Sequence, residues 1–326
     1  MVRGDVQRPE EWKLHEEYAP VGVAERRQLT WFNREGVALG TVGPPDEAGL
    51  SGAELAPDGK RVAVTRTVQG NHDVYLIDTG RDVSNRFTLQ PGLDGSPLWS
   101  SDGTRVVFSS RRNDAENLFE KAANGSGEER SLLPSGELKM AQDWSRDGRW
   151  LLYNTRHPKT GLDLWAAPMA GDGKPVPVID APFDETAGQF SPDGQWVAYQ
   201  SNESRPVQIY IRPFPGPGSP RQLTTAGGSQ PRWRPDGKEL FYVALDGRLM
   251  AVPIAVGADR QLETGTAVAL FRPQLATGPN INSGGNGSRA QYAVARDGRF
   301  LMNVTVAEAT PTPITVVLNW DAALKK

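Results

Sequence analysis

The stretch Phe190–Ser201, FSPDGQWVAYQS, combines an aromatic residue, an Asp-Gly turn and an alternating strand. Related stretches begin at residues 55, 99, 144, 233 and 294, so the chain carries six copies of this unit. The turn aspartates are Asp58, Asp102, Asp147, Asp193, Asp236 and Asp297, at spacings of 44, 45, 46, 43 and 61 residues. A period near 44 is typical of a four-stranded propeller blade, which buries its faces against its neighbours.

Each part of the repeat has a physical role. Asp-Gly favours a tight hairpin, because Asp bonds the turn backbone and Gly accepts a positive φ. The alternation that follows, as in Val197 and Tyr199, predicts a half-buried strand. Aromatic residues occupy one equivalent position before the turn in four copies, at Trp99, Trp144, Phe190 and Trp233. We predict that these rings pack between blades.

The two ends of the chain decide how the ring closes. Five copies are followed by two further strand-like segments, which makes five complete blades. The sixth copy lacks them, although residues 313–320, PITVVLNW, also read as a strand. Residues 29–43 form a strand–turn–strand pattern that could complete the last blade and remove its free edges. The sequence predicts an all-β, six-bladed β-propeller of four-stranded blades closed by N-terminal strands, with seven blades as the alternative.

The predicted organisation has three parts. The propeller spans residues 29–320. Residues 1–28 are charged and lack the repeat, so we expect a linker or short helix outside the ring. Residues 321–326 are a C-terminal tail. Within the propeller, residues 277–290 are rich in Gly, Asn and Ser and predict a loop.

Composition narrows the function classes. The absence of cysteine excludes disulfides, zinc–thiolate sites and thiol nucleophiles. A net charge of −3 gives no reason to expect nucleic acid as a partner. No apolar run reaches the roughly 18 residues of a membrane-spanning helix, so no membrane insertion is predicted. The first residues lack an apolar core, so no signal peptide is predicted.

Catalytic patterns are also missing from the sequence. The histidines, His15, His72 and His157, show no metal-ligand spacing. No Gly-x-Ser-x-Gly turn is present to hold a nucleophilic serine. We therefore predict no catalytic residue, no metal site and no cofactor.

Polar side chains on the innermost strands are expected to line the central channel. They lie just before the aromatic position, at Glu54, Asp143, Gln189 and Arg232. Such a set could bind a cation, water or a polar ligand. The alternative is a hydrated channel in which Arg232 neutralises a neighbouring carboxylate, because buried charges persist when they are paired.

Arginines recur where the second strand of a blade ends. Arg66, Arg111, Arg112 and Arg156 follow that strand directly, and Arg205 comes slightly later. Equivalent positions become neighbours on one face of a ring, so these groups could bind carboxylates, sulfates or an acidic peptide. The alternative is a set of inter-blade salt bridges with Asp94, Glu137, Asp184 and Glu185, each worth roughly 0–1 kcal/mol if exposed.

The repeated blades resemble the TolB-like, WD-repeat-like family of bacterial propellers over residues 29–320. Residues 26–43, 227–253 and 313–326 resemble the C-terminal propeller of membrane-anchored bacterial serine/threonine protein kinases. That resemblance implies an extracytoplasmic or periplasmic sensor module, preceded by a kinase domain and one membrane helix. The chain has no His-Arg-Asp loop and no Asp-Phe-Gly motif, so no kinase activity is assigned to it.

Three functions remain open from the sequence. The first is a non-catalytic binding or sensor propeller whose ligand is a peptide, a glycan or another protein, an anionic one if the arginines bind it. The second is a hydrolase or lyase that uses Asp143, Glu54 or Arg232 in the channel. The third is a TolB-like periplasmic platform for protein interactions. Propellers host all three, so the fold does not choose among them.

Overall fold

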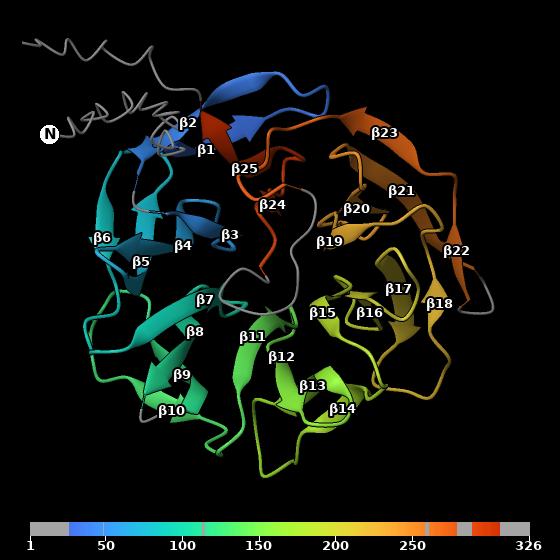
Figure 1. The fold of residues 1–326 in the computed structure, drawn as a ribbon, viewed down its shortest axis with the longest axis horizontal. Helices are drawn as coiled ribbons and strands as arrows, with labels where there is room; N and C mark the ends of the chain where they lie inside the picture. The colour runs from blue at the N-terminus through green and yellow to red at the C-terminus, as the bar shows by residue number, and fades with distance from the viewer. Residues whose placement is uncertain (1–25, 48, 113–114, 258–260, 279–288, 307–326) are drawn as a thin grey trace, which may run out of the picture.

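The computed structural model describes residues 26–306 except 48, 113–114, 258–260 and 279–288. These residues form six antiparallel sheets arranged around a central axis (Figure 1). Segment 313–320, the predicted tail 321–326 and most of the predicted N-terminal region 1–28 lie outside the described residues. The last three residues of that region, 26–28, belong to a strand of the ring and not to a linker outside it. The prediction of a six-bladed all-β propeller is confirmed, and the seven-bladed alternative is wrong.

The strands of each blade are given from the innermost to the outermost. Blade 1 contains β3 (Ser51–Leu55), β4 (Arg61–Val68), β5 (Asn71–Asp78) and β6 (Ser84–Arg86). Blade 2 contains β7 (Leu93–Trp99), β8 (Arg105–Arg112), β9 (Ala115–Ala122) and β10 (Arg130–Leu132). Blade 3 contains β11 (Lys139–Trp144), β12 (Trp150–His157), β13 (Gly161–Pro168) and β14 (Val176–Ile179).

The second half of the ring follows the same order. Blade 4 contains β15 (Glu185–Phe190), β16 (Trp196–Ser201), β17 (Gln208–Pro213) and β18 (Arg221–Gln222). Blade 5 contains β19 (Ser229–Trp233), β20 (Glu239–Val243), β21 (Leu249–Val256) and, both paired with β21, β22 (Leu262–Thr264) and β23 (Val268–Phe271). Blade 6 contains β24 (Tyr292–Val294), β25 (Phe300–Val306), β1 (Arg26–Phe32) and β2 (Ala38–Asp46).

Blade 6 closes the ring with strands from both ends of the described chain. β1 pairs with β25 in an unbroken antiparallel register from Arg26 opposite Val306 to Phe32 opposite Phe300. β2 then forms the outer edge by pairing with β1. The predicted closure by N-terminal strands is therefore confirmed, with the first strand beginning at Arg26.

The Asp-Gly turns have the predicted hydrogen bonds. In blade 3 the Asp147 carboxylate accepts the Ser145 hydroxyl at 2.6 Å and the Arg149 N–H at 3.0 Å. The Ser145 oxygen in turn accepts the Trp150 N–H at 2.9 Å. Gly148 has a φ of 74°, a backbone conformation that glycine adopts at little cost. The same residue types therefore fix the same hairpin in successive blades.

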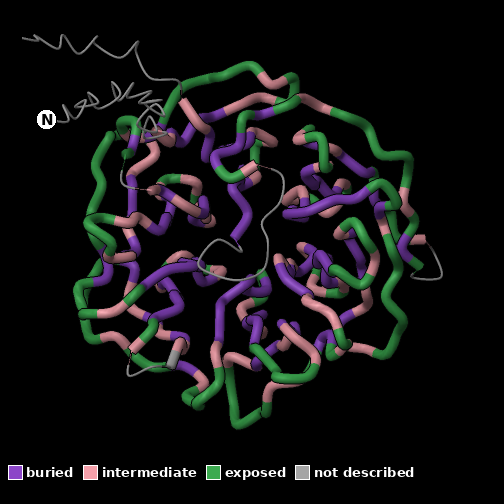
Figure 2. The backbone as a smooth tube through the Cα atoms, viewed as in Figure 1, coloured by how far each residue is buried: buried purple, intermediate pink, exposed green. Residues whose placement is uncertain are grey.

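The hydrophobic core is divided among the contacts between adjacent blades. Trp99 of blade 2 packs with Ala63 and Leu76 of blade 1, and Trp144, Phe190 and Trp233 lie in the corresponding clusters of the next blades. The Trp99 indole N–H also donates to the Glu54 carbonyl at 2.9 Å. The predicted role of these aromatics is confirmed. Figure 2 shows the buried residues gathered on the inner parts of the blades.

A recurrent bulge on the innermost strands determines which side chains face the axis. The strand register shifts immediately before Glu54, Leu98, Asp143, Gln189 and Arg232. In four of these blades the bulge holds a residue with positive φ, namely Gly52, Ser96, Ala187 and Gln230. A bulge redirects the side chains that follow it. The polar residues of the channel are therefore placed by one repeated backbone irregularity.

Candidate binding sites in the channel and on the two faces

The ring has two faces that differ in chemistry. The Asp-Gly turns between the first and second strands lie on one of them, which we call the turn face. The second strands end on the other, which carries Arg66, Arg111, Arg112, Arg156 and Arg205 and which we call the arginine face. The chain also enters each innermost strand on the arginine face.

The channel holds an ion pair between blades that are not neighbours. The Arg232 guanidinium of blade 5 lies 3.0 Å from the Glu54 carboxylate of blade 1. Arg232 also donates to the Tyr292 carbonyl of blade 6 at 3.3 Å. Both side chains are largely buried, at 8% and 16% exposed, so their charges depend on each other. Arg232 thus neutralises a carboxylate inside the ring.

Arg289 is a central residue that sequence reasoning missed. It is 6% exposed and its guanidinium lies 3.4 Å from the Glu54 carboxylate. It donates to the carbonyls of Ala141 at 3.2 Å and Gln142 at 2.6 Å in blade 3, and to that of Pro97 in blade 2. One side chain just ahead of blade 6 therefore contacts three other blades. The role of Arg289 could not be predicted from the sequence, because this residue lies near the end of the Gly/Asn/Ser-rich stretch 277–290, outside the repeat.

Asp143 is a buried acidic group of the channel. Burial, and then the negative charge of Glu54, raise the pKa of Asp143 to about 7. The Phe190 N–H donates to this carboxylate at 2.7 Å, and this bond and Arg232 act in the opposite direction. Asp143 therefore exchanges its proton near neutral pH. Gln189, in contrast, accepts the Trp233 N–H at 2.7 Å and links two blades.

The channel opens on the turn face into a cavity of 460 Å³, which we call the turn-face cavity. Glu54 and Asp143 line it, together with Trp31 and Trp144. Arg146 and Arg296, from two of the Asp-Gly turns, also line it. The turn-face cavity is therefore the place where channel side chains meet the surface.

On the arginine face, Arg66 and Arg112 are held by acidic partners. Arg66 lies 2.5 Å from Asp46 of β2, which links blade 1 to blade 6. Arg112 lies 2.7 Å from Glu129 and 3.7 Å from Asp94, both within blade 2. Arg66 and Arg112 also stack over aromatic rings. These two guanidinium groups have structural partners.

The other three arginines of this face are exposed. The charge of Arg111 acts on Glu116, whose pKa is nevertheless raised by burial. Within the described residues, Arg156 and Arg205 form no ion pair and no hydrogen bond through their side chains. They lie on adjacent blades, 3 and 4. The structure therefore separates the predicted set into two paired and three exposed members.

A buried acidic group lies between blades 3 and 4. Glu185, at the start of β15, is 1% exposed, and burial raises its pKa to about 8. The charges of Asp163 and Asp184 act in the same direction, while a 3.2 Å hydrogen bond from Ser201 opposes them. The sequence interpretation made Glu185 a partner for an arginine. Its described neighbours instead include other carboxylates.

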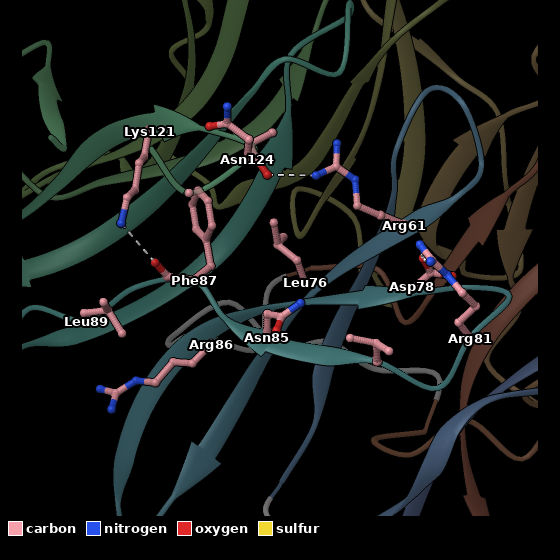
Figure 3. A pocket seen from close by; sticks show the side chains of 13 residues that line it. Arg61, Leu76, Asp78, Arg81, Asn85, Arg86, Phe87, Leu89, Lys121 and Asn124 are labelled. Atoms are coloured by element: carbon pink, nitrogen blue, oxygen red, sulfur yellow. Dashed lines mark hydrogen bonds and ion pairs between the residues drawn. The ribbon is translucent and has the colours of Figure 1, made fainter. Parts of the chain in front are cut away.

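A further cavity, of 490 Å³, lies away from the channel between the outer strands of blades 1 and 2 (Figure 3). Its polar side chains make contacts within the protein. Arg61 donates to the Ala123 carbonyl at 2.7 Å, and Lys121 donates to the Phe87 carbonyl at 3.3 Å. This cavity is a groove between blades whose basic residues already have partners.

Neither a metal-binding cluster nor a membrane-spanning helix occurs in the described part of the chain. No group of three histidine, aspartate or glutamate side chains there is arranged to hold a metal ion. No helix long and apolar enough to cross a membrane occurs there either.

Comparison with known proteins gives the family resemblance. Residues 47–164 match the family model described as TolB beta propeller domain; this segment contains blades 1 and 2 and reaches into β13. Over these residues the chain resembles a TolB β-propeller domain. The Tol-Pal system protein TolB of Wolinella succinogenes is 26% identical over 117 residues. That match covers 36% of this chain and 27% of the relative, so the chain spans about a quarter of its length.

Longer matches extend over most of the chain. An uncharacterized protein of Agrobacterium fabrum is 25% identical over 206 residues, covering 58% of this chain and 68% of that protein. A structure described as putative TolB from Agrobacterium tumefaciens is 17% identical with a TM-score of 0.62, covering 88% of this chain and all of the other. An oligogalacturonate lyase in complex with manganese has a TM-score of 0.54 at 15% identity, covering 88% and 99%. The two structural matches support the fold alone.

Proposed function

We propose that this TolB-like propeller is a non-catalytic module that binds an anionic partner through its arginine face. The observation that carries the proposal is the exposure of Arg111, Arg156 and Arg205 on three consecutive blades. A guanidinium group is more weakly hydrated than an ammonium group and can form paired hydrogen bonds with a carboxylate. Arg66 and Arg112, which are paired internally, position this surface without taking part directly.

The partner in this proposal is a protein or peptide. A relative is named for the Tol-Pal system, which favours an interaction platform over an enzyme. The resemblance of residues 26–43 and 227–253 to receptor-kinase propellers supports a sensor placed outside the cytoplasm. A kinase domain and a membrane helix encoded ahead of residue 1 would support the receptor form of this proposal, and a free-standing secreted protein would support the platform.

The arginine face can be tested by thermal unfolding in the presence of glutamate-rich peptides. A ligand at 100 times its Kd stabilises the folded state by about 2.7 kcal/mol, which raises the midpoint measurably. We expect such a shift for the wild-type chain and its loss in the Arg156→Glu/Arg205→Glu variant. Arg149→Glu, an exposed arginine on the turn face, serves as the control. An equal shift in the double variant, or no shift at all, would contradict the proposal.

A second function is favoured by Asp143. Its carboxyl group lines a cavity of 460 Å³ and has a pKa of about 7, near the value that suits a general acid or base at neutral pH. The fold is shared with an oligogalacturonate lyase. The candidate is therefore a lyase or hydrolase acting at the turn-face cavity.

Turnover of acidic polysaccharide distinguishes this second function from the first. We expect no cleavage of oligogalacturonate by the wild-type chain, with or without added manganese. The reason is that Glu54, which lines the same cavity as Asp143, is held in ion pairs with Arg232 and Arg289. The formation of unsaturated ends can be followed by ultraviolet absorbance. Cleavage that disappears in a folded Asp143→Asn variant would overturn the non-catalytic proposal.

A further inference from the structure

One position of the repeat places side chains at the turn-face mouth of the channel. It is the residue immediately before the turn aspartate, which is Pro57, Ser101, Arg146, Pro192, Pro235 and Arg296 in chain order. Four of the six are proline or serine. The two arginines belong to blades 3 and 6, which lie opposite each other in a six-bladed ring. The repeat therefore sets two guanidinium groups across one opening.

The Arg146 side chain extends over this opening. Its guanidinium donates to the Pro235 carbonyl in the turn of blade 5 at 2.7 Å, two blades away from its own. Both Arg146 and Arg296 line the turn-face cavity. The two cations are thus placed at the rim of one cavity.

Their charges lack the counter-ions that neighbouring arginines have. In the same turns, Arg149 lies 2.5 Å from Asp147, and Arg299 lies 2.8 Å from Asp297. Arg146 and Arg296 form no ion pair within the described residues. Burial, and then the charge of Arg296, lower the pKa of Arg146, while Asp143 and Asp236 raise it. An anion between the two guanidinium groups would relieve their repulsion.

The channel beneath them also carries an excess of positive charge. Glu54 is paired with both Arg232 and Arg289. The channel and its mouth together present five cations, Arg146, Arg232, Arg289, Arg296 and Arg299, against four carboxyl groups, those of Glu54, Asp58, Asp143 and Asp297. Asp143 exchanges its proton near neutral pH, so its carboxyl group is uncharged for part of the time. The local charge therefore favours a negatively charged ligand.

We propose that the turn-face cavity binds a carboxylate group between Arg146 and Arg296. Guanidinium groups hold carboxylates through paired, charge-assisted hydrogen bonds. A volume of 460 Å³ lies within the range of about 300–1,000 Å³ typical of small-ligand sites. The carboxylate could belong to a free small acid or to an acidic side chain that a partner inserts. This site lies on the opposite face from the proposed arginine-face surface and does not depend on it.

Isothermal titration calorimetry with two probes tests the site and separates the two sources. The first probe is succinate, and the second is the peptide acetyl-Gly-Glu-Gly-amide, with the glutamine peptide as its neutral counterpart. We expect at least one acidic probe to bind, and we expect its affinity to fall with added salt. If the glutamate peptide binds, the glutamine peptide should bind at least tenfold more weakly. Succinate binding alone would indicate a free acid, and glutamate-peptide binding alone an inserted side chain.

Variants on the turn face and on the arginine face provide the controls. Arg146→Gln/Arg296→Gln should weaken binding at least tenfold, while Arg149→Gln, in the same turn as Arg146, should leave it unchanged. Arg156→Glu/Arg205→Glu should also leave it unchanged, so that failure of this site and failure of the arginine face are distinguishable. If the double glutamine variant does not fold, Arg296→Gln alone replaces it. The absence of millimolar binding to either probe, or equal binding by the glutamine variant, would overturn the proposal.

Discussion

Replacing Arg289 with alanine is expected to lower the free energy of unfolding by about 3–5 kcal/mol, the range for breaking a buried ion pair. The guanidinium contacts Glu54 and the carbonyls of Pro97, Ala141 and Gln142. Its removal leaves several buried acceptors without a donor and takes one of two cations from Glu54. The expected effect is large because one side chain, just ahead of blade 6, joins blades 1, 2 and 3 at the axis.

Denaturant unfolding of the whole chain measures this effect, with fluorescence of the tryptophans as the probe. Arg149→Ala is the matched control, since that arginine is 75% exposed and its ion pair with Asp147 should contribute no more than about 1 kcal/mol. A loss of less than about 1 kcal/mol for Arg289→Ala would mean that water replaces the guanidinium in the channel. The inter-blade role assigned to Arg289 would then be wrong.

The fold could be predicted from the sequence because its information is local and repeated. The Asp-Gly turn, the aromatic before it and the alternating strand after it each have a short-range cause, and the period of about 44 residues joins them into blades. Ring closure was also predictable, since residues 29–43 had no inner strands of their own. The pairing of β1 with β25 joins this N-terminal segment to the inner strands of the last blade.

The contacts at the axis were predicted only in part. Glu54, Asp143, Gln189 and Arg232 were found because they occupy an equivalent position in the repeat. The bulge that orients these side chains could not be predicted from the sequence, because four different residue types, among them Ser96 and Ala187, adopt its positive φ. Arg289 lies outside the repeat, so no spacing places it. Long-range contacts of this kind depend on the geometry of the closed ring, so they produce no periodic pattern in the sequence.

The partners of the arginines show the same limit. Acidic residues were expected opposite them, and Arg112 does lie 3.7 Å from Asp94. The sequence could not tell that Arg66 would pair with Asp46 of β2, because that contact depends on how the ring closes. It also could not tell that Glu185 would be buried near Asp163.

Replacing Glu185 with glutamine is expected to stabilise the protein, and increasingly so as the pH rises. The pKa of Glu185 is raised from 4.5 to about 8, so between these values the folded state binds more protons than the unfolded state. Stability associated with this group is therefore present below the unfolded pKa and is lost as the pH rises through about 8. Glutamine resembles the protonated carboxyl and carries no such loss. With about 1.4 kcal/mol per pKa unit, the gain should be about 1 kcal/mol at pH 5 and about 3–5 kcal/mol at pH 9.

Unfolding curves of wild type and Glu185→Gln across this pH range test the prediction. The control is Glu128→Gln, which removes an exposed carboxylate and should change stability by less than about 0.5 kcal/mol at every pH. A pH-independent gain would mean that glutamine packs better without any role for ionisation. A loss of stability at pH 9 would mean that Glu185 is charged and well solvated in the folded protein. The buried carboxylate therefore makes the contact between blades 3 and 4 weaker at alkaline pH.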